Sequence, residues 1–359
     1  MKVLHIISGL RVGGAETQLY NLVKNFKNKN NSIKIVSFKD GPYSNKLKSL
    51  NIDVSILDID NVINFILSLI SLVRIIKNFK PDIVHSWMYH ANILSFITNI
   101  FVSKKIKKIW SIRCSNMKFS FFSSIKLVFF LNYLFSNFSD VLVYNSNAGK
   151  KYHEIYGFNN KKTITIYNGF DTEKYKKRFV NQKKFKLKNN IPLNFKIGLS
   201  IARVDNMKNY QSLIKISKSI DNFFLIIVGR GTEKFNYKNI KGFGEKNELS
   251  TFYNIADFFI LNSSYGEGFS NVLAEAMLSG LVPISTDVGD SKLILDKYGI
   301  LINPDSEIEL KKSIKKIIDN PFSENYINSM INYLKNKFNN DIMTKNYIKL
   351  YNDITNAKQ

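Results

Sequence analysis

The chain begins MKVLHIISGLRVGGAETQLYNLV (residues 1–23), and this stretch predicts the first strand, loop and helix of the fold. Residues 3–8 have the apolar, β-branched character of a buried strand and are too short for the apolar core of a signal peptide. Gly13 and Gly14 then precede a segment with helical periodicity. Such a pair lets backbone N–H groups approach a phosphate at the positive end of a helix dipole, although many strand–helix turns are glycine-rich only for packing.

The same alternation of short β-branched runs and amphipathic segments continues along the whole chain. In the first half, the expected strands lie at residues 3–8, 33–37, 54–57, 83–85, 108–112, 141–144 and 163–167. In the second half, they lie at 196–201, 224–228, 257–261, 282–285 and 300–302. The two series predict an α/β protein with two Rossmann-like, doubly wound domains facing a central cleft. Ligands of such sheets bind at the carboxyl ends of the strands.

A lysine-rich stretch separates the two strand–helix series, and the length of 359 residues suits two domains. We therefore expect a first domain at residues 1–173 and a linker with a charged, solvated helix at 174–190. The second domain should occupy 191–335. Residues 336–359 should form a final helical segment, for which one option is to pack back on the first domain.

The chain is strongly basic, with 52 basic and 28 acidic side chains and a net charge of +24. Of the basic residues, 46 are lysines and 6 are arginines, a bias that an AT-rich genome alone can produce. The sequence has no recognisable nucleic-acid-binding module, so we expect no nucleic-acid partner. Residues 1–170 have a net charge of +15 and residues 171–359 one of +9, so the first half is the better candidate for facing an anionic surface.

Two apolar segments call for a membrane test. Residues 62–73 are too few and too polar to span a bilayer. Residues 119–138 are interrupted by Lys126 and Asn132, which leaves two options. The segment is either a buried helix or an interfacial helix whose phenylalanines, among them Phe121, Phe122, Phe129 and Phe130, enter the lipid.

The sequence gives little support for a disulfide or a metal site. Cys114 is the only cysteine, which excludes a disulfide within the chain and fits a reducing compartment. The four histidines form no cluster with it. Asp58-Ile59-Asp60 has oxygen ligands that could hold Mg²⁺, but it lies away from the motifs below, so we interpret it as a loop after a strand.

Two cations follow the expected strand at residues 196–201. Arg203 and Lys208 lie five residues apart on one loop, a spacing at which they can bind both phosphates of a diphosphate and neutralise its charge as it leaves. The alternative is an ordinary pair of surface cations in a lysine-rich protein. The position at the carboxyl end of a strand favours the binding role.

The most specific motif reads EGFSNVLAEAMLSGLVP (residues 267–283). Glu267 falls in a loop, and Glu275 lies in the helix that we expect to start near Ser270. The free N–H groups of Phe269, Ser270 and Asn271 at that helix end would bind a phosphate. The two carboxylates could then accept hydrogen bonds from hydroxyl groups of a sugar and of a ribose; the structural alternative is that Glu275 only caps the helix or forms a salt bridge.

Taken together, these motifs resemble the family-four glycosyltransferases of the GT-B fold, particularly those that build bacterial O-antigen, capsule or other surface polysaccharide. The matching pieces, in chain order, are residues 13–16, 85–92, 167–171, 202–203 with Lys208, 228–229, 267–283 and 286–289. Single motifs of this kind are common, but this order and spacing is specific. Two positions depart from the family pattern: Arg230, where an acidic residue is frequent, and Asp290, where glycine is usual. Both bear on the identity of the donor more than on the reaction.

The resemblance implies roles for the residues in the second domain, which would bind the nucleotide-sugar. Arg203 and Lys208 would stabilise the diphosphate as the leaving group. Glu267, with the backbone amides of Gly268, Phe269 and Ser270, would hold the transferred sugar and the phosphate. Glu275 would bind the ribose hydroxyl groups.

The resemblance also implies roles for the first, acceptor-side domain. Gly13 and Gly14 would contact the donor diphosphate. His90 would project toward the transferred sugar. Arg113 follows a strand and, on weaker grounds, would meet a phosphate of the acceptor.

The function that the resemblance implies is retaining transfer of a hexosyl or N-acetylhexosaminyl group. The donor would be a nucleotide-sugar, most often a UDP-sugar, which is a co-substrate, so no cofactor is expected. The resemblance also implies no metal requirement. The acceptor would be a polyprenyl-diphosphate-linked glycan in lipopolysaccharide or O-antigen biosynthesis. We therefore expect a cytoplasmic protein, peripheral on the inner face of the cytoplasmic membrane, with an anionic membrane surface as a partner.

Two mechanisms and two rival classes stay open at this point. Retention could use a carboxylate nucleophile, as in retaining glycosidases, but both glutamates have binding roles, so front-face substitution assisted by the leaving phosphate is favoured. One rival is another GT-B enzyme, such as a nucleotide-sugar epimerase, which would release sugar without an acceptor. The other is a non-enzymatic module that binds anionic lipid or nucleic acid; the intact cation pair and both glutamates argue against it.

Overall fold

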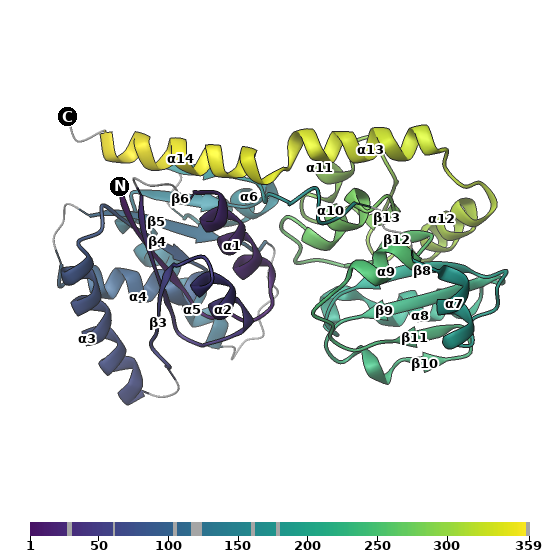
Figure 1. Ribbon diagram of the computed structural model, residues 1–359, viewed down its shortest axis with the longest axis horizontal. Helices are drawn as coiled ribbons and strands as arrows, with labels where there is room; N and C mark the ends of the chain where they lie inside the picture. The colour runs from purple at the N-terminus through teal and green to yellow at the C-terminus, as the bar shows by residue number, and fades with distance from the viewer. Residues whose placement is uncertain are drawn as a thin grey trace. The chain divides into compact units, whose positions relative to one another are not determined.

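The computed structural model describes residues 1–26, 31–59, 62–102, 106–115, 124–158, 162–176 and 180–356. The chain forms two compact units. Unit 1 comprises Met1–Gly169 together with Asn340–Gln359, and unit 2 comprises Phe170–Asn339. Each unit is a sheet of mostly parallel strands covered by helices (Figure 1).

Unit 1 has a seven-stranded sheet in the order β3-β2-β1-β4-β5-β6-β7, and all its neighbouring strands pair in parallel. The strands are β1 (Lys2–Ile7), β2 (Ser32–Ser37), β3 (Asp53–Ile56), β4 (Ile83–Trp87), β5 (Lys107–Ile112), β6 (Val141–Tyr144) and β7 (Thr163–Thr165). The helices are α1 (Gly14–Phe26), α2 (Pro42–Lys48), α3 (Val62–Phe79), α4 (Tyr89–Asn99), α5 (Ser124–Phe135), α6 (Asn147–Ile155) and α14 (Asn340–Asn356). The strand order reverses between β1 and β4, which is where doubly wound sheets bind their ligands.

The period of two along β1 explains how its sheet is covered on both faces. Val3 and Ile7 pack into one core cluster, which includes Leu22 of α1. Leu4 and Ile6 pack into a second cluster on the other face, with helices α3 and α4. Because both faces are buried, the strand is apolar along nearly its whole length, as parallel strands usually are.

Helix α14 completes the core of unit 1 although it follows unit 2 in the chain. It packs against α1, and Met343, Tyr347, Leu350 and Tyr351 are buried in the same cluster as Val3. The segment expected at residues 336–359 is formed mainly by α14, in unit 1, whereas the preceding helix α13 (Glu324–Lys337) belongs to unit 2. The chain crosses between the units at Gly169–Phe170 and at Asn339–Asn340.

Unit 2 has a seven-stranded sheet in the order β10-β11-β9-β8-β12-β13-β14. The strands are β8 (Lys196–Ile201), β9 (Phe223–Val228), β10 (Asn236–Tyr237), β11 (Ile240–Gly242), β12 (Phe258–Leu261), β13 (Val282–Thr286) and β14 (Ile300–Ile302). The helices before α13 are α7 (Gln182–Lys188), α8 (Tyr210–Lys218), α9 (Ser250–Ile255), α10 (Asn271–Leu278), α11 (Ser291–Leu295) and α12 (Glu307–Asp319). Its order reverses between β8 and β12, so the loops after these strands meet at the ligand-binding position of the sheet.

The structure differs from the sequence prediction at residues 174–190, expected to be a linker. The helix expected in this stretch is present as α7, but it belongs to unit 2 rather than to a linker. The Lys186 ammonium is buried and donates to the carbonyls of Leu193 and Phe195, at 3.0 and 2.7 Å. Gln182 donates to the carbonyl of Ile255, at 2.7 Å. The lysine-rich composition suggested a solvated segment because it does not reveal which lysine finds carbonyl partners.

The apolar segment at residues 119–138 is helical where it is described, in α5. Phe129 is 7 % exposed and Phe130 is 53 % exposed, so one side of this helix is packed and another is open to solvent. Phe121 and Phe122 lie outside the described residues, as does Asp60 of the Asp-x-Asp motif. In the described parts of the chain, no helix combines the length and the apolar character needed to cross a membrane.

Candidate functional site

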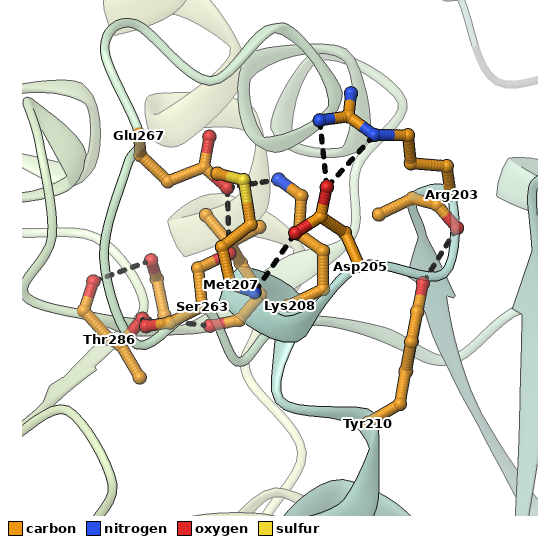
Figure 2. Close-up of polar contacts among 11 residues, drawn as sticks. Arg203, Asp205, Met207, Lys208, Tyr210, Ser263, Glu267 and Thr286 are labelled. Carbon is orange, nitrogen blue, oxygen red and sulfur yellow. Dashed lines mark hydrogen bonds and ion pairs between the residues drawn. The ribbon is translucent and has the colours of Figure 1, made fainter. Parts of the chain in front are cut away.

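The loop after β8 is shaped by Asp205, two residues beyond Arg203. Asp205 Oδ1 accepts a hydrogen bond from the Met207 N–H at 3.1 Å and thereby caps a short 3₁₀ turn at Asn206–Lys208. Its Oδ2 accepts from Arg203 Nε and Nη2, at 3.2 and 3.0 Å (Figure 2). Burial alone would raise the pKa of Asp205, but the hydrogen bonds from Met207 and Arg203 outweigh it and hold the pKa below its usual value. Arg203 itself remains 54 % exposed and lies at the carboxyl end of the strand.

Lys208 and Glu267 form an ion pair that joins the loops after β8 and β12. Both side chains are largely buried, at 14 % and 10 % exposed. Ser263 Oγ donates to the same Glu267 Oε1 at 2.6 Å, and Thr286 Oγ1 at the end of β13 donates to the Ser263 carbonyl at 2.7 Å. The carboxylate is therefore fixed from two sides at the point where the strand order reverses.

Close backbone approach explains the glycine at position 289. A Cβ there would lie 2.4 Å from the Glu267 carbonyl oxygen and 2.6 Å from that of Gly268, and the φ angle is +64°. The next residue, Asp290, donates its backbone N–H to the Gly268 carbonyl at 3.0 Å. The loop after β13 thus supports the backbone of Glu267 and Gly268. Asp290 provides this support through its backbone N–H, so the position does not need the glycine that is usual in the family.

Helix α10 begins at Asn271, with Ser270 as its N-cap residue. Ser270 makes no side-chain capping hydrogen bond to the helix within the part of the chain that is described. The Phe269 side chain is buried and packs against Phe170 and Phe338, with ring centroids 6.0 and 5.0 Å apart. Phe269 therefore contributes its side chain to the core of unit 2, and only its backbone can serve the anion site expected at this helix end.

Glu275 lies on α10 in a buried polar cluster. Tyr253 of α9 donates its hydroxyl to Glu275 Oε2 at 2.9 Å, and Tyr175 also hydrogen bonds the carboxylate. Burial raises the pKa of Glu275, although the Tyr253 hydrogen bond and the positive charge of Lys174 oppose the shift. These protein partners were not foreseen from the sequence, and the binding of ribose by Glu275 stays a prediction.

In unit 1, Gly13 directly precedes α1, and Gly14 is the first residue of that helix. A Cβ on Gly13 would lie 2.4 Å from a carboxylate oxygen of Glu16, and the Gly13 carbonyl accepts from the Thr17 N–H and Oγ1, at 3.0 and 2.8 Å. Desolvation raises the pKa of Glu16, while Arg113 lowers it. The close atoms belong to the end of a flexible side chain, which can move, so packing by itself does not require glycine at position 13.

His90 and Arg113 follow the neighbouring strands β4 and β5. His90 lies in the first turn of α4, is exposed, and has its pKa lowered by partial desolvation. Arg113 is half-buried; its guanidinium lies 5.0 Å from the Trp87 ring centroid and donates to Asn168 Oδ1. Burial lowers the pKa of Arg113 from its ordinary value.

The structure therefore brings the predicted residues together within each unit. Arg203, Lys208, Glu267 and Gly268 gather at the strand reversal of unit 2, while Gly13, Gly14 and His90 follow the two strands at the reversal of unit 1. Sequence reasoning missed Asp205, Ser263 and Tyr253; the first two could have been suspected because polar residues at strand ends recur in such sites. Across the described residues, no group of three His, Cys, Asp or Glu side chains could hold a metal ion.

Two family models match most of the chain. The model described as Glycosyltransferase Family 4 matches residues 12–174, and the model described as Glycosyl transferases group 1 matches residues 181–337. The chain is 24% identical over 356 residues, 89% of its own length and 91% of the relative, to CapH, a capsular polysaccharide biosynthesis glycosyltransferase of Staphylococcus aureus.

Two further relatives match in part. An uncharacterized glycosyltransferase of Methanocaldococcus jannaschii is 28% identical over 238 residues, 61% of this chain and 59% of the relative. The N-acetylgalactosamine-N,N'-diacetylbacillosaminyl-diphospho-undecaprenol 4-alpha-N-acetylgalactosaminyltransferase of Campylobacter jejuni is 25% identical over 213 residues, 55% and 56% of the two chains. In both cases the match spans less than two thirds of the relative's length.

Solved structures show the same architecture. The crystal structure of Anabaena HepE in complex with UDP-glucose superposes with a TM-score of 0.84 at 18% identity, covering 98% of this chain and 100% of that one. This likeness establishes the fold. With family models matched over residues 12–174 and 181–337, the chain belongs to the group 1 glycosyltransferases with the GT-B fold.

Proposed function

We propose that the protein transfers a sugar, with retention of anomeric configuration, from a UDP-sugar to a polyprenyl-diphosphate-linked glycan in bacterial surface polysaccharide biosynthesis, of the lipopolysaccharide or O-antigen kind. The observation that carries this proposal is the Lys208–Glu267 ion pair at the strand reversal of unit 2, with Arg203 on the same loop. Three of the similar proteins support it: CapH acts in capsule biosynthesis, the Campylobacter jejuni enzyme acts on a diphospho-undecaprenol, and HepE was crystallised with UDP-glucose.

The proposed chemistry rests on stabilising the departing diphosphate. Lys208 and Arg203 supply two positive charges, and the first turn of α10 supplies backbone N–H groups at the positive end of the helix dipole. As the bond from the sugar to the phosphate breaks, negative charge grows on the phosphate, and these fixed groups stabilise that state more than the ground state. The departing phosphate then assists removal of the proton from the attacking hydroxyl on the same face of the sugar, which preserves the configuration.

Glu267 is proposed to accept hydrogen bonds from hydroxyl groups of the transferred sugar. Its Oε1 accepts hydrogen bonds from Lys208 and Ser263, which hold the carboxylate in place. Glu275 is proposed to bind the ribose. In unit 1, Gly13 and Gly14 are proposed to contact the diphosphate and His90 the transferred sugar. Arg113 is proposed to meet a phosphate of the acceptor with its guanidinium, which Asn168 and the Trp87 ring also contact.

The lipid-linked acceptor and an anionic membrane surface are proposed partners of unit 1. Seven apolar side chains on and beside α4 and α5, each at least 43 % exposed, would enter the interface: Ile100, Phe101, Ile125, Leu127, Phe130, Leu134 and Phe138. Lys107 and Lys108 lie on β5, and Lys104 and Lys105 lie outside the described residues. Exposed apolar side chains near basic residues suit a protein that works peripherally at the cytoplasmic face of a membrane.

The proposal is tested by incubating the purified protein with UDP-, GDP- and ADP-sugars and a synthetic polyprenyl-diphosphate-linked acceptor. We expect acceptor-dependent release of UDP and a product with the anomeric configuration of the donor. An inverted product would overturn the retaining mechanism, and preference for GDP- or ADP-sugars would overturn the donor assignment. Release of an epimerised free sugar without acceptor would identify an epimerase instead.

A further inference from the structure

The backbone just before His90 is strained. Met88, the N-cap residue of α4, has φ +74° and ψ 162°, a backbone conformation that residues other than glycine rarely adopt. Its N–H donates to the Ser111 carbonyl at 2.9 Å. Backbone strain of this kind persists only where the surrounding structure fixes the backbone, and strained residues are enriched at functional sites.

A chain of buried hydrogen bonds fixes the next residue, Tyr89. The Tyr89 hydroxyl lies 2.5 Å from His153 Nε2, and Cys114 Sγ lies 3.3 Å from the same hydroxyl. His153 Nδ1 lies 2.6 Å from the Gly149 carbonyl oxygen. All four groups belong to unit 1, and Tyr89 and His153 are buried.

The protons of this chain can be assigned from the donors and acceptors. Desolvation lowers the pKa of His153 to about 4, so its ring is neutral and carries one N–H. The Gly149 carbonyl can only accept, which places that hydrogen on Nδ1 and leaves Nε2 as an acceptor. Tyr89 therefore donates its O–H to His153 Nε2. Burial raises the pKa of Cys114 to about 11, so the thiol is protonated and donates to the Tyr89 oxygen.

The main chain of Tyr89 is held separately from its side chain. Asn132 of α5 donates through Nδ2 to the Tyr89 carbonyl at 3.0 Å. Asn132 is oriented in turn by Asn92, whose Nδ2 donates to Asn132 Oδ1 at 3.2 Å. Ser86 at the end of β4 donates to Asn92 Oδ1 at 2.7 Å. The turn between β4 and α4 is thus connected to α5 through Asn132 and to α6 through His153, and in each of these hydrogen bonds a donor meets an acceptor.

We propose that Tyr89 is a positioning residue, which uses its bonds to His153 and Asn132 to hold the exposed His90 in the orientation that contacts the transferred sugar. The inference rests on the proposed role of His90. A ring that follows directly after a fixed residue has few orientations left, and reacting groups lose much of their effect when they are displaced by about 1 Å. Tyr89 itself touches no reacting atom.

The test compares Tyr89→Phe with a matched control, Tyr144→Phe. Tyr144 is a buried tyrosine of the same aromatic cluster, and its hydroxyl has no hydrogen-bond partner among the described residues. Tyr89→Phe should lower kcat roughly tenfold, with KM for the nucleotide-sugar and the Kd for free UDP within about threefold of wild type. Tyr144→Phe should leave all three values unchanged. Equal losses of kcat in the two variants would overturn the proposal.

A double-mutant cycle with His90→Ala separates positioning from a general structural role. If Tyr89 acts through His90, adding Tyr89→Phe to His90→Ala should cause no further loss of kcat. Multiplying losses would overturn the inference while leaving the sugar contact of His90 intact. Wild-type turnover in His90→Ala would overturn both. If Tyr89→Phe does not fold, Asn132→Ala releases the Tyr89 carbonyl with the hydroxyl chain in place, and it enters the same cycle.

Discussion

Lys208 donates to Glu267 although 59 residues separate them in the chain, and both side chains are largely buried. The pair lies where β8 and β12 are neighbours in the sheet. A substrate diphosphate that binds Lys208 must therefore share this lysine with Glu267. A diphosphate that binds Arg203 must compete with Asp205, and Arg203 is more exposed than Lys208. The two cations should thus respond differently to substitution.

Removal of either cation should slow turnover by roughly 10²–10³-fold, as expected when a contact to charge in the transition state is lost. Arg203→Ala should leave the melting temperature unchanged because the side chain is exposed. Lys208→Met should destabilise the protein by about 1–3 kcal/mol because it leaves the buried Glu267 carboxylate without its cation. Steady-state kinetics and thermal unfolding check both, with the exposed Lys215→Met as control. Turnover within a few-fold of wild type in either variant contradicts the leaving-group role.

The two glutamates should separate nucleotide binding from transfer. Glu275→Gln should weaken binding of free UDP, since the ribose is present in UDP. Glu267→Gln should leave UDP binding within a few-fold while nearly abolishing transfer, since the partner of Glu267 is the sugar. Isothermal titration with UDP and a turnover assay measure the two effects. Equal UDP affinities in the two variants would show that the assigned roles are wrong.

Activity should survive an excess of EDTA, because the proposed leaving group is stabilised by Arg203, Lys208 and helix α10 and needs no divalent cation. The assay is turnover with and without the chelator, followed by addition of Mg²⁺ or Mn²⁺. A complete loss that either ion restores would place a metal at the leaving phosphate.

Binding to anionic vesicles should depend on both the charge and the apolar side chains of unit 1. Changing Lys104, Lys105, Lys107 and Lys108 to Gln should reduce co-sedimentation steeply, since each lysine near an anionic surface contributes about 1 kcal/mol. Leu127→Ser with Phe130→Ser should reduce it as well, and raising the salt concentration should weaken binding of the wild type. Ile308→Ser removes an even more exposed apolar residue from unit 2 and serves as the control. Equal recovery with neutral and anionic vesicles would exclude this surface.

Much of the fold could be predicted because strands buried on both faces leave apolar runs that stand out in a sequence, as β9 and β12 do. The edge pair β10 and β11, with two and three residues, is too short to leave such a run. The cations and glutamates were visible as motifs at strand ends. Ser263, four residues before Glu267, could have been suspected as a polar residue just after a strand. Tyr253, the partner of Glu275, could not, because a hydrogen bond between separate helices depends on how the helices pack rather than on local pattern.

The position of α14 sets an order of events during synthesis. Its buried residues Tyr347 and Tyr351 share a cluster with Leu22 and Phe26 of α1, yet the ribosome makes all of Phe170–Asn339 before it reaches them. In the nascent chain, the face of unit 1 that α14 later covers therefore stays exposed to water until unit 2 has been translated. Such a face is a natural binding site for a chaperone, and ribosome-bound chains halted before Asn340 should be more aggregation-prone than released ones.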